Sequence, residues 1–295
     1  MIGFIQTIFN GIIIGGTYAL MAVGLTLIFG FMKLVNFAHG ELYMLGAYFA
    51  YSLIVAAGLP FLIGFPLAIV GGVVVGYLLD VVLFRPLRHR DPEPFSMMAM
   101  LTTIGLVILF QNVAQLIWNP VPKRIPSPLD IGAIQVGGLG FRPSQLIVAI
   151  LAIVVIAAAH QFMQRTTPGL AMRATFQDPE VASLMGVSVD RIYSLTFALG
   201  AGLAAAGGAL LGMVFLITPT MGALASLKAF TVVILGGLGS FMGAVLGALV
   251  VGSAESLTAT YVSSGYAEAV AFLLLIIILI VRPQGILGRR AGVEQ

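Results

Sequence analysis

The sequence has no cysteine among its 295 residues, and only 8% of its residues are charged. The absence of cysteine excludes disulfides, thiolate metal sites and cysteine nucleophiles. The scarcity of charge, together with a hydrophobic share of 60%, excludes a soluble domain, because such a chain would leave most of its apolar surface in water. The sequence therefore predicts an integral membrane protein.

Two further absences narrow the function. The dipeptide Gly-Lys does not occur, so the phosphate-binding loop that ends in Gly-Lys-Ser/Thr is missing and the chain hydrolyses no ATP by that route. The histidines His39, His89 and His160 are scattered and have neither a serine partner nor metal-ligand spacing. We therefore expect no catalytic residue, no metal site and no bound cofactor. The net charge of +3 lies in loops and does not indicate a nucleic-acid partner.

Long uncharged stretches dominate the rest of the chain. One helical crossing needs about 20 apolar residues, so the longest stretches must cross the membrane more than once. The stretches are residues 1–32, 42–79, 94–122, 143–164 and 192–227. The first stretch has no basic flank and continues into further apolar sequence, so we interpret it as a retained helix and not as a cleaved signal peptide.

Glycine and proline divide two of these stretches. Gly58-Leu59-Pro60 separates helices of about 42–57 and 61–84, because glycine and proline together stop a helix and supply a turn. Thr218-Pro219 divides the last stretch in the same way.

Basic residues predict the orientation. The positive-inside bias places three basic clusters in the cytoplasm. The clusters are Arg85, Arg88 and Arg90; Arg165, Arg173 and Arg191; and Arg282, Arg289 and Arg290. Residues 95–118 and 144–163 then form one out-and-back pair around a proline-rich outer loop of about 119–143, and a cytoplasmic loop covers about 164–190. The C-terminus is predicted to be cytoplasmic.

The expected fold is a single all-α transmembrane domain over residues 1–295, a polytopic bundle of about 8–10 helices. We prefer ten, because residues 20–40 are expected to form a short, broken helix of their own, and eight or nine remain alternatives. The stretch from Pro219 to Leu257 must cross an even number of times, which predicts a second short helix near 219–240. Two interrupted segments in comparable places of the two halves indicate a midplane path.

The polar groups closest to the apolar core are Lys33, Asn36, His39, Glu41, Lys228 and Glu255. Ionisable groups at membrane depth are costly and mark pathways, so we take six polar residues as candidates for the translocation path. They are Asn36, His39, Glu41, Lys228, Thr231 and Glu255. The alternative for Lys33 and Lys228 is that they reach the membrane interface, and for Glu41 that it stabilises the start of the next helix. Glu255 is expected to face the bundle interior or an outer vestibule, not lipid.

Glycines recur at a spacing of four in several helices. Gly239, Gly243 and Gly247 are the clearest series. Small residues at this spacing let helix backbones approach closely, so we interpret the series as a packing face within the subunit. A dimer face is the alternative.

The polar stretch 166–190 contains the start of a surface helix. Asp178-Pro179-Glu180 supplies an N-cap, a proline for the first turn and an acid near the positive end of the helix dipole. Val181, Leu184 and Met185 then form an apolar face. We interpret that face as a docking site for a soluble partner. The alternative is that the helix lies against the ends of its own bundle.

Motifs along essentially the whole chain resemble those of LivH-type permeases of bacterial branched-chain amino acid ABC importers. They are Gly24-Leu25-Thr26-Leu27-Ile28-Phe29-Gly30, Leu34-Val35-Asn36-Phe37-Ala38-His39-Gly40-Glu41, Met44-Leu45-Gly46-Ala47-Tyr48, Arg85-Pro86-Leu87-Arg88, Gly169-Leu170-Ala171-Met172-Arg173-Ala174, Gly236-Gly237-Leu238-Gly239-Ser240 and Arg282-Pro283-Gln284-Gly285. The resemblance implies a multi-pass subunit of the bacterial inner membrane that moves hydrophobic amino acids by alternating access.

The resemblance also implies partners and a coupling helix. The partners would be a second, LivM-type permease, two cytoplasmic ATPases of the LivG and LivF types, which hold ATP and Mg²⁺, and a periplasmic binding protein. The coupling residues would be Asp178, Pro179, Glu180, Ala182, Leu184, Met185 and Gly186. Glu180, Ala182 and Gly186 match the family's E-A-A-x-x-x-G pattern, in which Val181 replaces the first alanine.

Three other functions remain open at this point. A permease for urea or short amides resembles the same family. An ion-coupled secondary transporter or channel would work without ATPase partners. A purely structural membrane subunit predicts that substitutions along residues 33–41 leave uptake unchanged.

Overall fold

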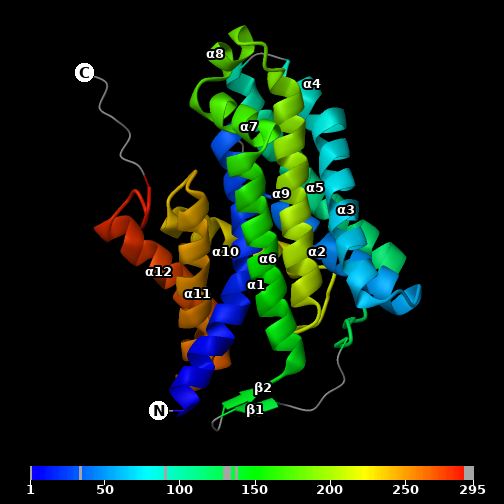
Figure 1. Ribbon diagram of the computed structural model, residues 1–295, viewed down its shortest axis with the longest axis vertical. Helices are drawn as coiled ribbons and strands as arrows, with labels where there is room; N and C mark the ends of the chain where they lie inside the picture. Colours follow the sequence, from blue (N-terminus) through cyan, green and yellow to red (C-terminus); the bar gives the residue numbers. More distant parts are fainter. Residues whose placement is uncertain (1, 33–34, 90–91, 129–133, 137–138, 289–295) are drawn as a thin grey trace.

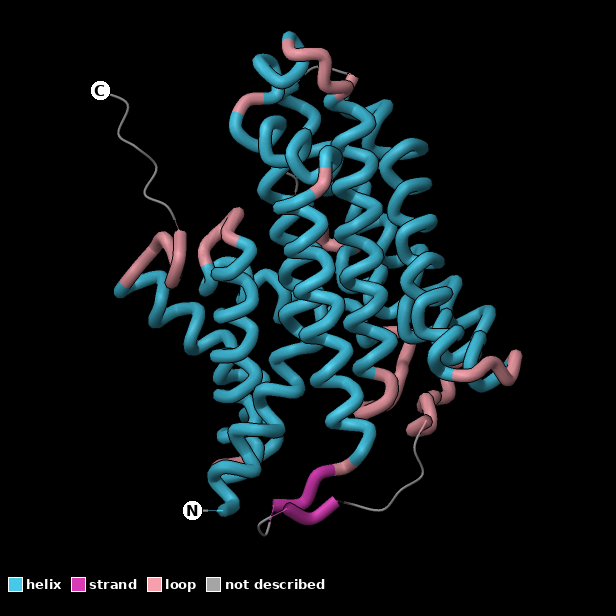
Figure 2. Tube along the Cα trace, in the orientation of Figure 1, coloured by secondary structure: helices cyan, strands magenta, loops and turns pink. Residues whose placement is uncertain are grey.

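The protein is a helical bundle, seen here in a computed structural model that describes residues 2–32, 35–89, 92–128, 134–136 and 139–288 (Figures 1 and 2). Lys33, Arg90, Arg289 and Arg290, which enter the sequence interpretation, lie outside the described residues. The helices are α1 Ile2–Met32, α2 His39–Tyr51, α3 Phe61–Leu79, α4 Arg85–Arg88, α5 Pro92–Trp118, α6 Pro143–Arg165, α7 Thr167–Gln177, α8 Pro179–Leu184, α9 Val189–Leu211, α10 Met221–Gly236, α11 Phe241–Tyr261 and α12 Ala267–Val281.

Short elements complete this list. The π-helical turns Ser52–Ala56 and Asp80–Phe84 extend α2 and α3, and the 3-10 turn Ser264–Tyr266 precedes α12. Strands β1 (Ile134–Val136) and β2 (Leu139–Phe141) pair antiparallel in the loop between α5 and α6.

Seven helical segments in the described part of the chain are long and apolar enough to cross a membrane. Two shorter helices, α2 with 13 residues and α10 with 16, join them in the bundle. The described residues therefore form nine bundle helices, one fewer than the preferred ten. The all-α fold class and the short helix near 219–240 are confirmed.

The expected separate helix within residues 20–40 is wrong. Helix α1 is one uninterrupted helix of 31 residues, and the break begins only after Met32. Its glycines do not end it, because at membrane depth the backbone groups of a helix are hydrogen-bonded within the segment and a break would leave some unpaired. The stretch up to Phe84 therefore holds three bundle helices, two long and one short, and not four.

The core lies around α1 and α9, whose spanning stretches are mostly buried. Helix α1 packs against α9 and α11, and α9 packs against α2 and α3 as well. Close approach depends on small residues: a Cβ placed on Gly208 of α9 would overlap the backbone carbonyl of Tyr43 in α2. Helices α6 and α12 are largely exposed along their spanning stretches, as expected of helices that face lipid.

The two ends of the bundle differ. Helices α4, α7 and α8 lie at one end, which we call the α8 end, and the β1–β2 hairpin lies with the start of α1 at the opposite hairpin end (Figure 1). The turn between α10 and α11 reaches the α8 end, where Gly239 packs against the ring of Phe176 in α7. The chain after α12 bonds to the same turn, with Ile286 N donating to Leu235 O at 2.8 Å.

Candidate functional site

The two short helices meet near their first turns. The backbone N–H of Gly40 in α2 donates to Ser226 Oγ in α10 at 2.9 Å, and Ser226 Oγ donates to the carbonyl of Phe37 at 2.9 Å. A Cβ on Gly40 would overlap the carbonyl of Gly222, so only glycine permits this approach. The structure thus brings together the two segments that the sequence predicted to be interrupted.

Glu41 is buried at this junction. Its Oε1 accepts a hydrogen bond from Gln111 Nε2 of α5 at 2.9 Å, and the carboxylate lies against the backbone of Gly222. Its Oε2 has no hydrogen-bond partner among the described residues. A buried carboxylate oxygen without a donor is energetically costly.

Three of the predicted path residues serve the local backbone instead. Asn36 Oδ1 accepts from the N–H of Ala38 at 3.0 Å, His39 Nε2 lies 3.0 Å from the carbonyl of Met21, and Thr231 Oγ1 donates to the carbonyl of Leu227 at 3.0 Å. All three side chains are buried. They shape the break before α2 and the packing of α10.

The remaining two predicted path residues, Lys228 and Glu255, form an ion pair in a second cluster. Lys228 Nζ of α10 lies 3.1 Å from Glu255 Oε1 of α11. Tyr18 of α1 completes the cluster: its hydroxyl donates to Glu255 Oε2 at 2.9 Å and accepts from Lys228 Nζ at 2.9 Å. Glu41 at the junction and the Lys228–Glu255 pair are therefore separate polar sites.

A cavity of about 390 Å³ adjoins this second cluster. Asn10 near the start of α1, Gln145 near the start of α6 and Thr260 near the end of α11 place it toward the hairpin end. Lys228 and Glu255 contribute to its wall. The arrangement is a polar recess that leads from that end to a charged pair between helices.

Helix α8 stands apart from the bundle at its end (Figure 1). Asp178 caps it, as the sequence predicts, and accepts hydrogen bonds from the N–H groups of Glu180 and Val181 at 2.8 and 3.0 Å. Ala182 is buried, whereas Leu184 is 87% exposed and Met185 is 81% exposed. The helix ends at Leu184, and Gly186 follows it with a φ of 86° that favours glycine. A rigid, exposed apolar face results.

The predicted glycine series divides between a helix and a turn. Gly243 and Gly247 of α11 lie against the backbone of α10, at Gly236 and Val232. Gly239 lies in the turn before α11, with a φ of 80°, and not on its helical face. A turn that needs a left-handed residue explains this glycine better than helix packing does.

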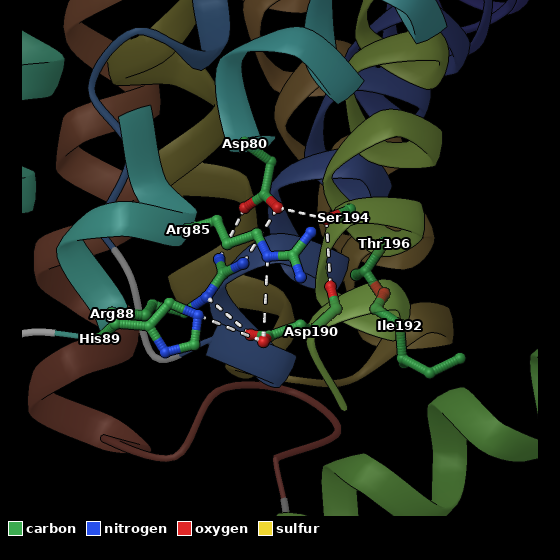
Figure 3. Close-up of polar contacts among 8 residues, drawn as sticks. All are labelled: Asp80, Arg85, Arg88, His89, Asp190, Ile192, Ser194 and Thr196. Carbon is green, nitrogen blue, oxygen red and sulfur yellow. Dashed lines mark hydrogen bonds and ion pairs between the residues drawn. The ribbon is translucent and has the colours of Figure 1, made fainter. Parts of the chain in front are cut away.

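Sequence reasoning missed a charge cluster where α3 ends and α9 begins (Figure 3). Arg88 donates to both oxygens of the buried Asp80 carboxylate, at 2.6 and 3.0 Å, and Ser194 Oγ donates to Asp80 Oδ2 at 2.6 Å. One signal was available: Asp80 is the single charge that interrupts the apolar sequence between residues 42 and 84. A lone carboxylate at membrane depth requires a partner.

The same cluster reaches the segment that follows α8. Asp190, in the first turn of α9, lies 3.3 Å from His89 Nε2 and 3.9 Å from Arg85 Nε and from Arg88 Nε. Helix α4 and the start of α9 are therefore joined by ionic contacts, and Ser194 and Asp80 continue the connection into α3.

Taken together, these features define a class of protein. Long apolar helices enclose interrupted segments and buried ionisable groups, and such groups within a membrane bundle are characteristic of transport proteins. The protein is therefore a multi-pass membrane permease.

Comparison with known proteins gives the family. The family described as "Branched-chain amino acid transport system / permease component" matches residues 7–279. The chain is 37% identical to the high-affinity branched-chain amino acid transport system permease protein LivH of Escherichia coli K12 and 36% identical to that of Salmonella typhimurium, in both cases over 97% of this chain and 96% of the relative. It is 37% identical to BraD of Pseudomonas aeruginosa over the same shares. The chain belongs to this permease family.

Proposed function

We propose that the chain is the transmembrane permease subunit of an ATP-driven importer that carries branched-chain amino acids across the bacterial inner membrane. The observation that carries the proposal is the exposed apolar face of α8 on a permease that lacks the Gly-Lys phosphate loop. Such a subunit takes its energy from a partner. The names of its relatives, as permease proteins of branched-chain amino acid transport systems, support the cargo.

The partner at α8 is a cytoplasmic ATPase. An apolar face rimmed by polar residues is typical of a protein–protein contact, and here it consists of Val181, Leu184 and Met185. Glu180 and Gly186 complete the coupling segment together with the cap residue Asp178. Two ATPases, of the LivG and LivF types, hold ATP and Mg²⁺, and a LivM-type permease and a periplasmic binding protein complete the importer.

Orientation follows from charge. Arg85, Arg88, Arg165 and Arg173 belong to the α8 end, and the positive-inside bias makes this end cytoplasmic. The chain after α12 bonds to the α10–α11 turn at the same end, which supports a cytoplasmic C-terminus. The hairpin end, with the polar cavity, then faces the binding protein.

Transport proceeds by alternating access of the bundle. Movement of α8 reaches α9 through the short segment 185–188, and the contacts among Asp190, Arg88 and Asp80 carry it into α4 and α3. A packed bundle has discrete arrangements, so small displacements at one end switch which end is open. Glu41, Lys228 and Glu255 contact the passage, while Asn36, His39 and Thr231 position the helices around it.

Reconstitution into liposomes tests the proposal. The permease pair with its ATPases and leucine-loaded binding protein is expected to accumulate radiolabelled L-leucine only when ATP is supplied. The same permeases without ATPases are the matched control and are expected to accumulate none. Accumulation by the permeases alone under a proton or sodium gradient would contradict the proposal, as would uptake of urea in preference to leucine.

A further inference from the structure

The ion pair of Lys228 and Glu255 is accessible from the polar cavity. The Lys228 side chain is 16% exposed and that of Glu255 is 7% exposed, and both line the cavity. The pair therefore lies at the boundary between the packed helices and an open recess. Its position places the pair in the wall of the recess that a small molecule would enter from the hairpin end.

Among the described residues, the hydrogen bonds within the cluster leave one oxygen of Glu255 without a hydrogen-bond donor. Tyr18 and Lys228 both bond to Glu255 Oε2, whereas Oε1 is held by the ion pair and has no hydrogen bond of good geometry among the described residues. A buried charge pair stabilises a protein weakly and can often be replaced by apolar residues without loss. Helices α10 and α11 already pack closely through Gly236 and Gly243. Packing alone therefore does not require the pair.

We propose that Lys228, Glu255 and Tyr18 form the binding site for the charged head group of an α-amino acid that enters the permease from the hairpin end. The α-carboxylate binds Lys228 Nζ, and the α-ammonium binds Glu255 Oε1. A zwitterion adds no net charge to this neutral pair. Each charge of the ligand lies beside a protein charge of opposite sign, so all four charges are compensated away from bulk water. The inference rests on the proposed function and assigns its entry site.

One part of the cavity suits an apolar side chain. Ile13 and Ile14 of α1 and Val214 and Phe215 after α9 line this part, whereas Asn10, Gln145 and Glu268 are among the polar residues of the remaining wall. Its volume of about 390 Å³ lies within the roughly 300–1,000 Å³ of small-molecule pockets, which combine apolar walls with a few polar groups. The expected ligand is therefore an α-amino acid with an aliphatic side chain.

Direct binding to the purified importer tests the site. The complete complex without its binding protein, in lipid nanodiscs, is titrated with radiolabelled L-leucine. Leucinamide, which lacks the carboxylate, and 4-methylpentanoate, which lacks the ammonium group, are competitors and are expected to displace leucine far less well than L-isoleucine does. Lys228→Met and Glu255→Gln are each expected to weaken binding about tenfold or more, since each removes a charge-assisted contact. Lys123→Met, outside the cavity, is the matched control and is expected to bind normally.

The double variant Lys228→Met with Glu255→Gln separates a ligand site from a structural pair. If the pair only stabilises the bundle, the single variants leave an orphan charge and the double variant recovers. If it binds the zwitterion, the double variant assembles but binds leucine no better than either single variant. Normal leucine binding by the assembled double variant, or displacement by leucinamide equal to that by isoleucine, would overturn the inference. ATP-driven uptake by the wild-type complex in the same preparation shows whether the proposed function itself stands.

Discussion

Arg88 holds the carboxylate of Asp80 through two parallel hydrogen bonds, of 2.6 and 3.0 Å, where α3 meets α4. Asp80 is completely buried and the Arg88 side chain is 10% exposed. Arg88→Ala would leave the carboxylate with Ser194 as its remaining donor. We expect a loss of about 3–5 kcal/mol of stability, as for other broken buried ion pairs. The measurement is the thermal unfolding midpoint of the detergent-purified complex.

Arg85→Ala is the matched control for this prediction. Arg85 contacts Asp190 at 3.9 Å with a side chain that is 43% exposed, so its loss is expected to cost at most about 1 kcal/mol. Equal destabilisation by the two variants would show that Asp80 does not depend on Arg88.

A second prediction concerns the contact between α2 and α9. A Cβ on Gly208 would overlap the carbonyl of Tyr43, so Gly208→Ala must separate the two helices. The expected cost is about 1–3 kcal/mol from overpacking, with reduced yield of assembled permease in membranes. Gly105→Ala on α5 meets no atom within 4 Å and is expected to fold normally. A normal yield of Gly208→Ala would contradict the packing described.

The hydroxyl of Ser226 ties the two short helices together, and its removal supplies a third prediction. Ser226→Ala would leave the buried N–H of Gly40 unpaired, at an expected cost of about 1–3 kcal/mol. Protection of the Gly40 amide from hydrogen exchange is expected to fall. Ser188→Ala is the control, because Ser188 precedes α9 without capping it. Unchanged exchange at Gly40 in Ser226→Ala would argue against the junction.

The cap of α8 gives a fourth prediction. Asp178→Ala removes the acceptor for the N–H groups of Glu180 and Val181, and losing such a cap costs about 0.5–2 kcal/mol of helix stability. Hydrogen exchange in residues 179–185 is expected to accelerate while the bundle keeps its unfolding midpoint. Asp178→Asn retains a capping side chain and is expected to behave like the wild type. Slow exchange in both variants would mean that α8 does not rely on its cap.

Features set by neighbouring residues were predictable from sequence. The uncharged apolar run predicted a crossing over 144–163, and α6 spans Pro143–Arg165. Asp178-Pro179-Glu180 predicted the start of α8, because capping depends on residues a few positions apart. Within the apolar stretch 1–32 the glycines carried no signal for the length of the helix, since glycine in a membrane-embedded helix does not mark its end.

Contacts between distant segments could not be predicted in the same way. Tyr18 and Glu255 lie 237 positions apart and meet only because α1 packs against α11. Asp80 and Ser194 meet because α3 packs against α9. Polar residues at membrane depth indicated that partners exist, but the assignment of those partners required the packing of the whole bundle.

The central claim is that energy enters this permease through α8, and the variant Leu184→Glu tests it most directly. Leu184 is 87% exposed, so the substitution leaves the fold intact but places a charge in the proposed ATPase contact. Leucine uptake and stimulation of ATP hydrolysis by the loaded binding protein are measured together in proteoliposomes, with Leu184→Met as the matched control. We predict that Leu184→Glu loses both activities in a permease pair that still inserts normally, and that Leu184→Met keeps both. Full uptake and full stimulation in Leu184→Glu would contradict the account.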